Sequence, residues 1–337
     1  MTGRYRALLA AGPDGMPARL VERDEDDLDE GDVTVEVTWA GLNYKDALAV
    51  TGRAPVARRF PLVAGIDLAG RVVDAPAGGP APGSYVVVTG CGLGEDHDGG
   101  FAERARVAAA WCVPLASAAE ARWAATIGTA GLTAMLSVLA LERLGALDDP
   151  GGRPVLVTGS AGGVGSFAVA LLAARGSPVV AATGRPGEEG YLRRLGAGEV
   201  LERADLLGGP DRPLGRERFA AAVDVAGGRL LARVLAQIRA GGAVAACGLA
   251  GGAELETTVY PFILRGVTLT GINSVWPDPG VRRAAWARLR ADAPTGLADE
   301  VGAEIALDEV VARAPDVLDG RVRGRLLVRV GSPPGVA

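Results

Sequence analysis

The chain has 337 residues, 49% of them apolar, and a formal net charge of −5, so about two domains of roughly 150 residues each are expected. An acidic chain with scattered arginines is a poor candidate for a nucleic-acid partner, and one histidine and three cysteines are too few for most metal sites or a disulfide framework. Neither a signal peptide nor an apolar run of membrane-spanning length is apparent. We therefore expect a cytoplasmic protein with no bound metal and no membrane partner.

The first hundred residues predict a β-rich unit. Apolar residues alternate with polar ones from Val33 to Trp39, which is the period of a half-buried strand. Shorter apolar runs at Leu68–Val73 and Tyr85–Thr89 are bounded by Gly and Pro, as strands in a turn-rich sheet are.

Helical patterns begin after this unit. Ser117 and Glu120 form a capping-box pattern that predicts a helix start, and a second helix is predicted over Leu132–Leu144. Farther on, short apolar strands alternate with helices that each end at a glycine. These strands are predicted at 155–158, 179–182, 222–225 and 244–247. Such alternation is typical of a parallel sheet with helices on both faces.

The end of the chain returns to β character at Val267–Gly271 and Arg325–Val330, with a helix near Val281–Ala291. This return indicates that the two chain ends fold together. We predict an α/β protein with a β-rich domain from residues 1–118 and 265–337, and a doubly wound parallel-sheet domain from residues 119–264. Val267–Gly271 is also a candidate strand for joining two copies across a two-fold axis.

The strongest local signal is a glycine turn that follows the strand Val155–Thr158 and opens a helix. Gly162 allows a pyrophosphate to approach the backbone, Gly165 allows tight packing of helix on strand, and the helix N-terminus offers its amides to the phosphates. Ser160 replaces the first glycine of the usual G-x-G-x-x-G pattern. The context predicts a dinucleotide site, and the alternative is a merely structural turn.

The next strand ends in Thr183-Gly184-Arg185, with no carboxylate to accept from a ribose 2′-hydroxyl. A hydroxyl and a guanidinium instead suit a 2′-phosphate, which predicts NADPH rather than NADH. Arg203, just beyond the following short strand, either adds a second cation or is a solvated surface arginine.

Several segments together resemble one family. They are 41–46 (GLNYKD), 61–70 (PLVAGIDLAG), 128–134 (GTAGLTA), 162–165 (GGVG) and 246–252 (ACGLAGG). This combination is similar to the zinc-free medium-chain dehydrogenase/reductases called quinone-oxidoreductase-like, and most similar to their acrylyl-CoA reductase branch. The resemblance implies a GroES-like catalytic domain from both chain ends, a Rossmann domain between them, NADPH as cofactor, and a homodimer.

The same resemblance explains why no zinc site is expected. Zinc-dependent relatives carry a Cys where this chain has Asn43, and Gly-His-Glu where it has Gly65-Ile66-Asp67. Both ligand positions are therefore lost.

The resemblance also implies cofactor contacts, with Tyr44 bordering the nicotinamide. Core packing is the alternative for Leu249 and Ile263. The implied contacts are Ala161, Gly162, Gly163, Val164 and Gly165 at the pyrophosphate, Thr183, Gly184, Arg185 and Arg203 at the 2′-phosphate, and Leu249, Ile263, Ser274 and Gly320 elsewhere.

The implied reaction is conjugate reduction of a short enoyl-CoA, above all acryloyl-CoA to propanoyl-CoA, by hydride transfer to the β-carbon and protonation at the α-carbon. The candidate catalytic residues are Tyr44, Asn43 and Asp46. Tyr44 either donates the proton or forms a shelf for the nicotinamide while water donates it. Backbone amides or the Asn43 side chain stabilise the enolate, and Asp46 is expected to anchor the loop.

Two further groups are candidate substrate contacts. Arg323, with Arg325 beside it, either pairs with a CoA phosphate or is a solvated strand charge. His97 either touches substrate or is held within an acidic loop. Two other functions stay open: an NADPH:quinone or enone oxidoreductase, and an NADPH-binding protein without turnover.

Overall fold

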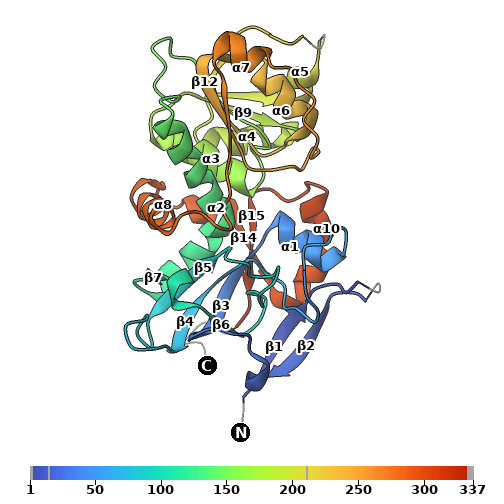
Figure 1. Ribbon diagram of the computed structural model, residues 1–337, viewed down its shortest axis with the longest axis vertical. Helices are drawn as coiled ribbons and strands as arrows, with labels where there is room; N and C mark the ends of the chain where they lie inside the picture. The colour runs from blue at the N-terminus through green and yellow to red at the C-terminus, as the bar shows by residue number, and fades with distance from the viewer. Residues whose placement is uncertain (1–2, 14–15, 210–211, 332–337) are drawn as a thin grey trace. The chain divides into compact units, whose positions relative to one another are not determined.

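The computed structural model describes residues 3–13, 16–209 and 212–331. The chain divides into two compact units (Figure 1). Unit 1 comprises residues 1–129 and 302–337, and unit 2 comprises residues 130–301.

Unit 1 contains a seven-stranded sheet to which both ends of the chain contribute, as the sequence predicts. The C-terminal strand β15 pairs antiparallel with β3, and β14 pairs parallel with β15 (Figure 1). The strands are β14 (Gly302–Ala306), β15 (Arg325–Arg329), β3 (Val33–Leu42), β4 (Asp67–Asp74), β5 (Tyr85–Thr89) and β7 (Val113–Leu115) in spatial order, with β6 (Arg104–Val107) paired to β3. A separate hairpin joins β1 (Arg4–Leu9) and β2 (Arg19–Asp24).

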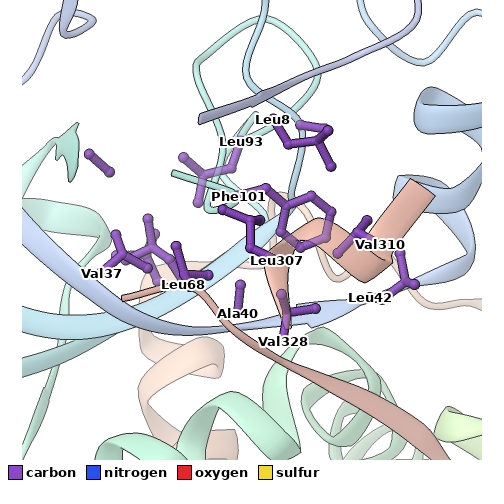
Figure 2. Close-up of a cluster of buried hydrophobic side chains, with 14 of the residues drawn as sticks. Leu8, Val37, Ala40, Leu42, Leu68, Leu93, Phe101, Leu307, Val310 and Val328 are labelled. Atoms are coloured by element: carbon purple, nitrogen blue, oxygen red, sulfur yellow. The ribbon is translucent and has the colours of Figure 1, made fainter. Parts of the chain in front are cut away.

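The core of unit 1 also draws on both chain ends. Phe101 is fully buried and lies with Leu307 and Val310 from the C-terminal segment (Figure 2). Helix α1 (Tyr44–Thr51) contacts α10 (Val310–Leu318). Short 3₁₀ turns lie at η1 (Glu25–Asp27), η2 (Ala109–Trp111) and η4 (Leu307–Glu309).

Unit 2 is the predicted doubly wound fold. The six strands among its described residues are parallel in the order β10-β9-β8-β11-β12-β13, so the winding direction reverses between β8 and β11, which is where such sheets bind ligands. The strands are β8 (Val155–Val157), β9 (Val179–Thr183), β10 (Glu199–Glu202), β11 (Phe219–Asp224), β12 (Ile238–Ala246) and β13 (Thr268–Gly271). The other elements are α3 (Gly163–Ala174), η3 (Pro186–Glu188), α4 (Glu189–Arg194), α5 (Arg203–Leu207), α6 (Gly228–Leu235), α7 (Tyr260–Arg265), α8 (Pro279–Asp292) and α9 (Leu297–Val301).

The units do not divide where the sequence analysis places the domain boundaries. Residues 265–301 belong to unit 2 because β13 pairs with β12 and extends the parallel sheet. Apolar runs do not reveal which sheet a strand joins, so β13 was assigned to the wrong domain. The first division falls after Thr129 instead of residue 118.

The long helix α2 (Ala118–Arg143) begins at the predicted cap, where the Ser117 hydroxyl accepts from the Glu120 amide at 3.2 Å. It is interrupted at Gly128, whose φ of 46° and ψ of −151° are not helical. By length and composition α2 could cross a membrane, yet 89% of its most apolar window is buried inside the protein. The apolar core helices of soluble proteins can have the same length and composition.

Candidate functional site

The glycine turn of unit 2 forms an anion site at the start of α3. Gly159 has a φ of +55°, and Gly162 is the N-cap of the twelve-residue helix. No acidic residue lies in the first turn, whose amides have no partners within the helix. Together with the buried Ala161, these amides present donors and positive dipole charge to a phosphate.

The glycines of this turn serve different purposes. A Cβ on Gly165 would lie 2.3 Å from the carbonyl oxygen of Gly159, so the fold itself requires glycine there. The nearest atom to a Cβ on Gly162 is 3.4 Å away, an ordinary contact. Gly162 therefore leaves space beside the loop that the protein does not fill.

A buried polar pair that the sequence patterns do not predict lies beneath the loop. The Thr158 hydroxyl donates to the Asp224 carboxylate at 2.7 Å and accepts from the Val225 amide at 3.0 Å. Asp224 also accepts from the Gly227 amide at 2.7 Å, and burial raises its pKa. The pair joins the carboxyl ends of β8 and β11 at the switch point. The available signal was an acid that directly ends an apolar strand.

The residues predicted for a 2′-phosphate lie together at the end of β9. Thr183 is buried, and its hydroxyl accepts from the Arg185 amide at 3.1 Å. The Arg185 guanidinium donates to the carbonyl of Ala161 at 2.8 Å. A Cβ on Gly184 would lie 3.1 Å from the Arg203 guanidinium carbon, so Arg203 stands over this turn. In the described part of the chain, Arg203 has neither an ion pair nor a side-chain hydrogen bond.

A hollow of about 450 Å³ opens at the carboxyl ends of β12 and β13, and its lining includes Cys247, Leu249 and Asn273. Leu249 and Ile263 are 56% and 67% exposed, so the core-packing alternative is wrong for both. Ser274 is half-buried and follows Asn273. Burial raises the pKa of the Cys247 thiol to about 12, which leaves it protonated at neutral pH.

Two predicted contacts fall in unit 1. Gly320 has a φ of +67° just beyond α10, and its amide donates to the carbonyl of Val317, which is how glycine commonly ends a helix. Arg323 is exposed in the turn before β15. Their roles at cofactor and substrate stay predictions.

Asn43 and Asp46 cap the first turn of α1. Asp46 accepts from the Asn43 amide and from the Ile66 amide, each at 2.8 Å. These hydrogen bonds fit the anchoring role predicted for Asp46. Tyr44 is the first residue of the helix and is 36% exposed. Within the described residues, its hydroxyl has no hydrogen-bond partner.

A buried ion pair lies under this turn. Arg325 and Asp67 are joined at 2.6 Å, with side chains 2% and 1% exposed. Neither sequence-based alternative for Arg325, CoA binding or a solvated charge, is right. A second guanidinium nitrogen donates to the Asn43 side-chain oxygen at 2.5 Å. Arg325 was misjudged because alternation along a strand does not show that a charged residue has an internal partner.

The Asn43 side-chain nitrogen is also occupied. It lies 2.8 Å from Asp46, 3.1 Å from Asp67 and 3.1 Å from the carbonyl of Gly41. An amide nitrogen has two hydrogens, and both face internal acceptors. The Asn43 side-chain nitrogen is therefore engaged inside the protein and is not available to stabilise an enolate. Backbone amides are the other group expected for that role.

Burial makes Asp46 sensitive to pH. Loss of hydration, with a further contribution from the nearby Asp67 charge, raises the pKa of Asp46 from 3.8 to about 7. Ionisation therefore costs more in the folded than in the unfolded chain, and stability falls as pH rises from about 4 to about 7. In urea unfolding, we expect the free-energy difference between wild type and Asp46→Asn to shrink over this range, by on the order of a few kcal/mol. A difference independent of pH would contradict this.

His97 is held inside its own loop. Its ring nitrogens lie 2.9 Å from the carbonyl oxygen of Asp98 and 2.8 Å from that of Glu30, and the ring packs edge-on against Trp111. Its side chain is 13% exposed. This arrangement matches the loop alternative and leaves no ring nitrogen for a substrate. Among the described residues, no group of three or more His, Cys, Asp or Glu side chains is placed to hold a metal.

Two family models match the chain. The alcohol dehydrogenase GroES-like domain matches residues 29–117, and the zinc-binding dehydrogenase domain matches residues 163–289. These matches fall in unit 1 and unit 2, respectively.

Curated relatives extend over nearly the whole chain. A probable acrylyl-CoA reductase AcuI of Escherichia coli is 48% identical over 96% of this chain and 99% of its own length. The acrylyl-CoA reductase AcuI of Ruegeria pomeroyi is 45% identical over 91% of this chain and 92% of its own. A putative quinone oxidoreductase YhfP of Bacillus subtilis is 41% identical over 98% of this chain and 100% of its own.

Two solved structures are similar to this chain in both sequence and fold. That of E. coli YhdH with bound NADPH is 48% identical, has a TM-score of 0.92 and covers 96% of this chain and 100% of its own. That of B. subtilis YhfP with bound NAD is 40% identical, has a TM-score of 0.91 and covers 97% of this chain and 100% of its own.

Proposed function

The chain belongs to the medium-chain dehydrogenase/reductase family, in its quinone-oxidoreductase-like group, and on this premise we propose that it is an NADPH-dependent reductase of the C=C bond of a short enoyl-CoA. Acryloyl-CoA is the proposed substrate and propanoyl-CoA the product. The observation that carries the proposal is 45–48% identity to acrylyl-CoA reductases over more than nine-tenths of the chain.

The residues of unit 2 fit a bound NADPH. The first turn of α3 would hold the pyrophosphate, and the space beside Gly162 admits it. Thr183, Arg185 and Arg203 would hold the 2′-phosphate, for which a hydroxyl and two guanidiniums are suitable donors. When bound, the cofactor supplies the hydride that is added to the β-carbon of the substrate.

Arg203 offers a test of cofactor choice because it faces the Gly184 turn with its charge unpaired among the described residues. A hydrogen bond to a charged group contributes about 1.5–3 kcal/mol, so Arg203→Glu is expected to raise the Kd of NADPH by about 10- to 100-fold or more. The Kd of NADH should change little, because NADH lacks the 2′-phosphate.

Fluorescence titration with both nucleotides measures this effect. Arg283→Glu is the matched control, because Arg283 is another exposed arginine of unit 2 and lies on α8. Equal weakening of NADPH and NADH by Arg203→Glu would remove Arg203 from the 2′-phosphate site.

Residues of unit 1 would complete the reaction. Hydride addition to the β-carbon leaves an enolate, which must take one proton at the α-carbon. Tyr44 is proposed as the donor, since the residue is 36% exposed and its hydroxyl has no partner in the described structure, and a placed hydroxyl can give a proton to a developing enolate. Backbone amides are proposed to stabilise the enolate oxygen.

The direct experiment follows NADPH oxidation by absorbance with acryloyl-CoA, crotonyl-CoA and a benzoquinone in parallel. The proposal expects turnover with the CoA esters, acryloyl-CoA foremost. Turnover with the quinone alone would favour the alternative that the B. subtilis relative supports, an NADPH:quinone or enone oxidoreductase. Binding of NADPH without oxidation by any substrate would favour a non-catalytic binding protein.

A homodimer is proposed from β13 and its surroundings. β13 is an edge strand of the described sheet of unit 2, and Tyr260, Leu264 and Trp276, which flank it in the sequence, are 46%, 62% and 58% exposed. An open sheet edge and exposed apolar side chains each favour a partner copy. Sedimentation should give twice the chain mass, and a monomer would refute this assembly.

A cytoplasmic location is proposed too, and fractionation of the cells that make the protein would test it.

A further inference from the structure

We propose that Arg325 is a positioning residue, which anchors the oxygen of the Asn43 side-chain amide and thereby holds the first turn of α1 where Tyr44 lies. The effect on turnover rests on the proposed function, whereas the effect on the turn does not. Within the described residues, the side-chain hydrogen bonds of Arg325 go to Asn43 and Asp67, so its influence on catalysis is indirect.

The guanidinium of Arg325 occupies a slot that two glycines keep open. A Cβ on Gly41 would lie 1.8 Å from a guanidinium nitrogen, and a Cβ on Gly128 would lie 2.2 Å from the same atom. Side chains at either position would displace the guanidinium. The slot is therefore built around this one group, with Asp67 as its counter-ion at 2.6 Å.

Arg325 is the donor that holds the oxygen of the Asn43 side-chain amide. Arginine only donates hydrogen bonds, so the Asn43 atom 2.5 Å from its guanidinium must be the oxygen. The amide nitrogen then faces the oxygens of Asp46, Asp67 and Gly41. With the guanidinium removed, the amide oxygen loses this donor, and the side chain is held only by the acceptors around its nitrogen.

The amide in turn fixes the start of α1. Asn43 directly precedes Tyr44 and is the N-cap of the helix, with its backbone amide bonded to Asp46. Asp67 holds the flanking chain, because it accepts from the backbone amides of Gly41 at 2.7 Å and Thr129 at 3.0 Å. The network therefore links β15 to the residue that carries the proposed proton donor.

Two variants disturb this link in different ways. Arg325→Lys keeps a positive charge for Asp67 but lacks the planar fork that reaches Asp67 and Asn43 together. Gly41→Ala changes none of the four polar side chains of the network, and its new Cβ displaces the guanidinium. These four side chains are those of Arg325, Asp67, Asn43 and Asp46. Arg23→Lys is the matched control, because Arg23 forms another partly buried pair in unit 1, with Asp98 at 2.6 Å, and does not contact Asn43.

Each variant is measured at the same number of degrees below its own Tm, with two readouts. Hydrogen exchange of a peptide covering residues 41–51, without substrate, should be faster in Arg325→Lys and Gly41→Ala than in Arg23→Lys. In turnover with acryloyl-CoA, kcat should fall by about 10²-fold, the effect of a displacement near 1 Å, while the KM for NADPH stays near the wild-type value.

Exchange and kcat that match those of the Arg23→Lys control would overturn the positioning role, since Arg325 would then act on stability alone. If the wild-type enzyme reduces no CoA ester, the proposed function fails, and the exchange comparison still decides whether Arg325 holds the turn.

Discussion

Tyr44→Phe is expected to lower kcat for acryloyl-CoA by about 10²-fold or more, because proton transfer by a placed side chain contributes about 10²- to 10⁴-fold. The substitution removes one hydroxyl, and that hydroxyl has no partner within the described residues, so folding should be unaffected. The ring is retained, so the KM for NADPH should change little even where the ring borders the nicotinamide. Steady-state kinetics at neutral pH measures both parameters.

Tyr85→Phe is the control for this prediction, since Tyr85 lies half-buried on β5, another element of unit 1. It should leave both parameters unchanged. Full turnover by Tyr44→Phe would assign the proton to water and leave Tyr44 with the other role considered for it, a shelf for the nicotinamide.

Gly165→Ala and Gly162→Ala are expected to separate folding of the glycine turn from nucleotide binding. At Gly165 the new Cβ would lie 2.3 Å from a backbone oxygen, so α3 must move away from the turn. We expect a loss of about 1–3 kcal/mol in the free energy of unfolding and a large loss of NADPH affinity, because the amides of the first helical turn move with it.

At Gly162 the corresponding distance is 3.4 Å, and the unfolding free energy should stay within about 1 kcal/mol of wild type. The added methyl group projects into the space proposed for the pyrophosphate, so the Kd of NADPH should rise by about tenfold or more. Urea unfolding and fluorescence titration measure the two effects. Wild-type affinity in Gly162→Ala would show that no phosphate approaches the backbone there.

Local patterns predicted most of the fold because they report local burial. The alternation from Val33 to Trp39 marked β3, and the apolar runs after residue 155 marked the parallel strands of unit 2. The glycine turn before α3 and the residues at the end of β9 were also located, since each is a short segment of contiguous backbone. Leu249 and Ile263 left two alternatives, and only their exposure decided against core packing.

Contacts between distant segments were not accessible in this way. Arg325 lies 258 residues from Asp67, its partner in the ion pair, and its neighbours on β15 are ordinary strand residues. The assignment of β13 failed for a similar reason, since the partner of a strand depends on the path of the whole chain.

By itself, the sequence determined that the chain lacks the histidines and cysteines for most metal sites, that its ends form a β-rich unit, and that a dinucleotide turn lies between them. Composition limits which side chains are available as metal ligands. The short-range periodicity of apolar residues shows which side of a helix or strand faces solvent. The tertiary structure alone decided how the few charged groups near Tyr44 are used. Burial makes an unpaired charge costly, and inside unit 1 Arg325 pairs with Asp67 while Asn43 bonds to both of them and to Asp46.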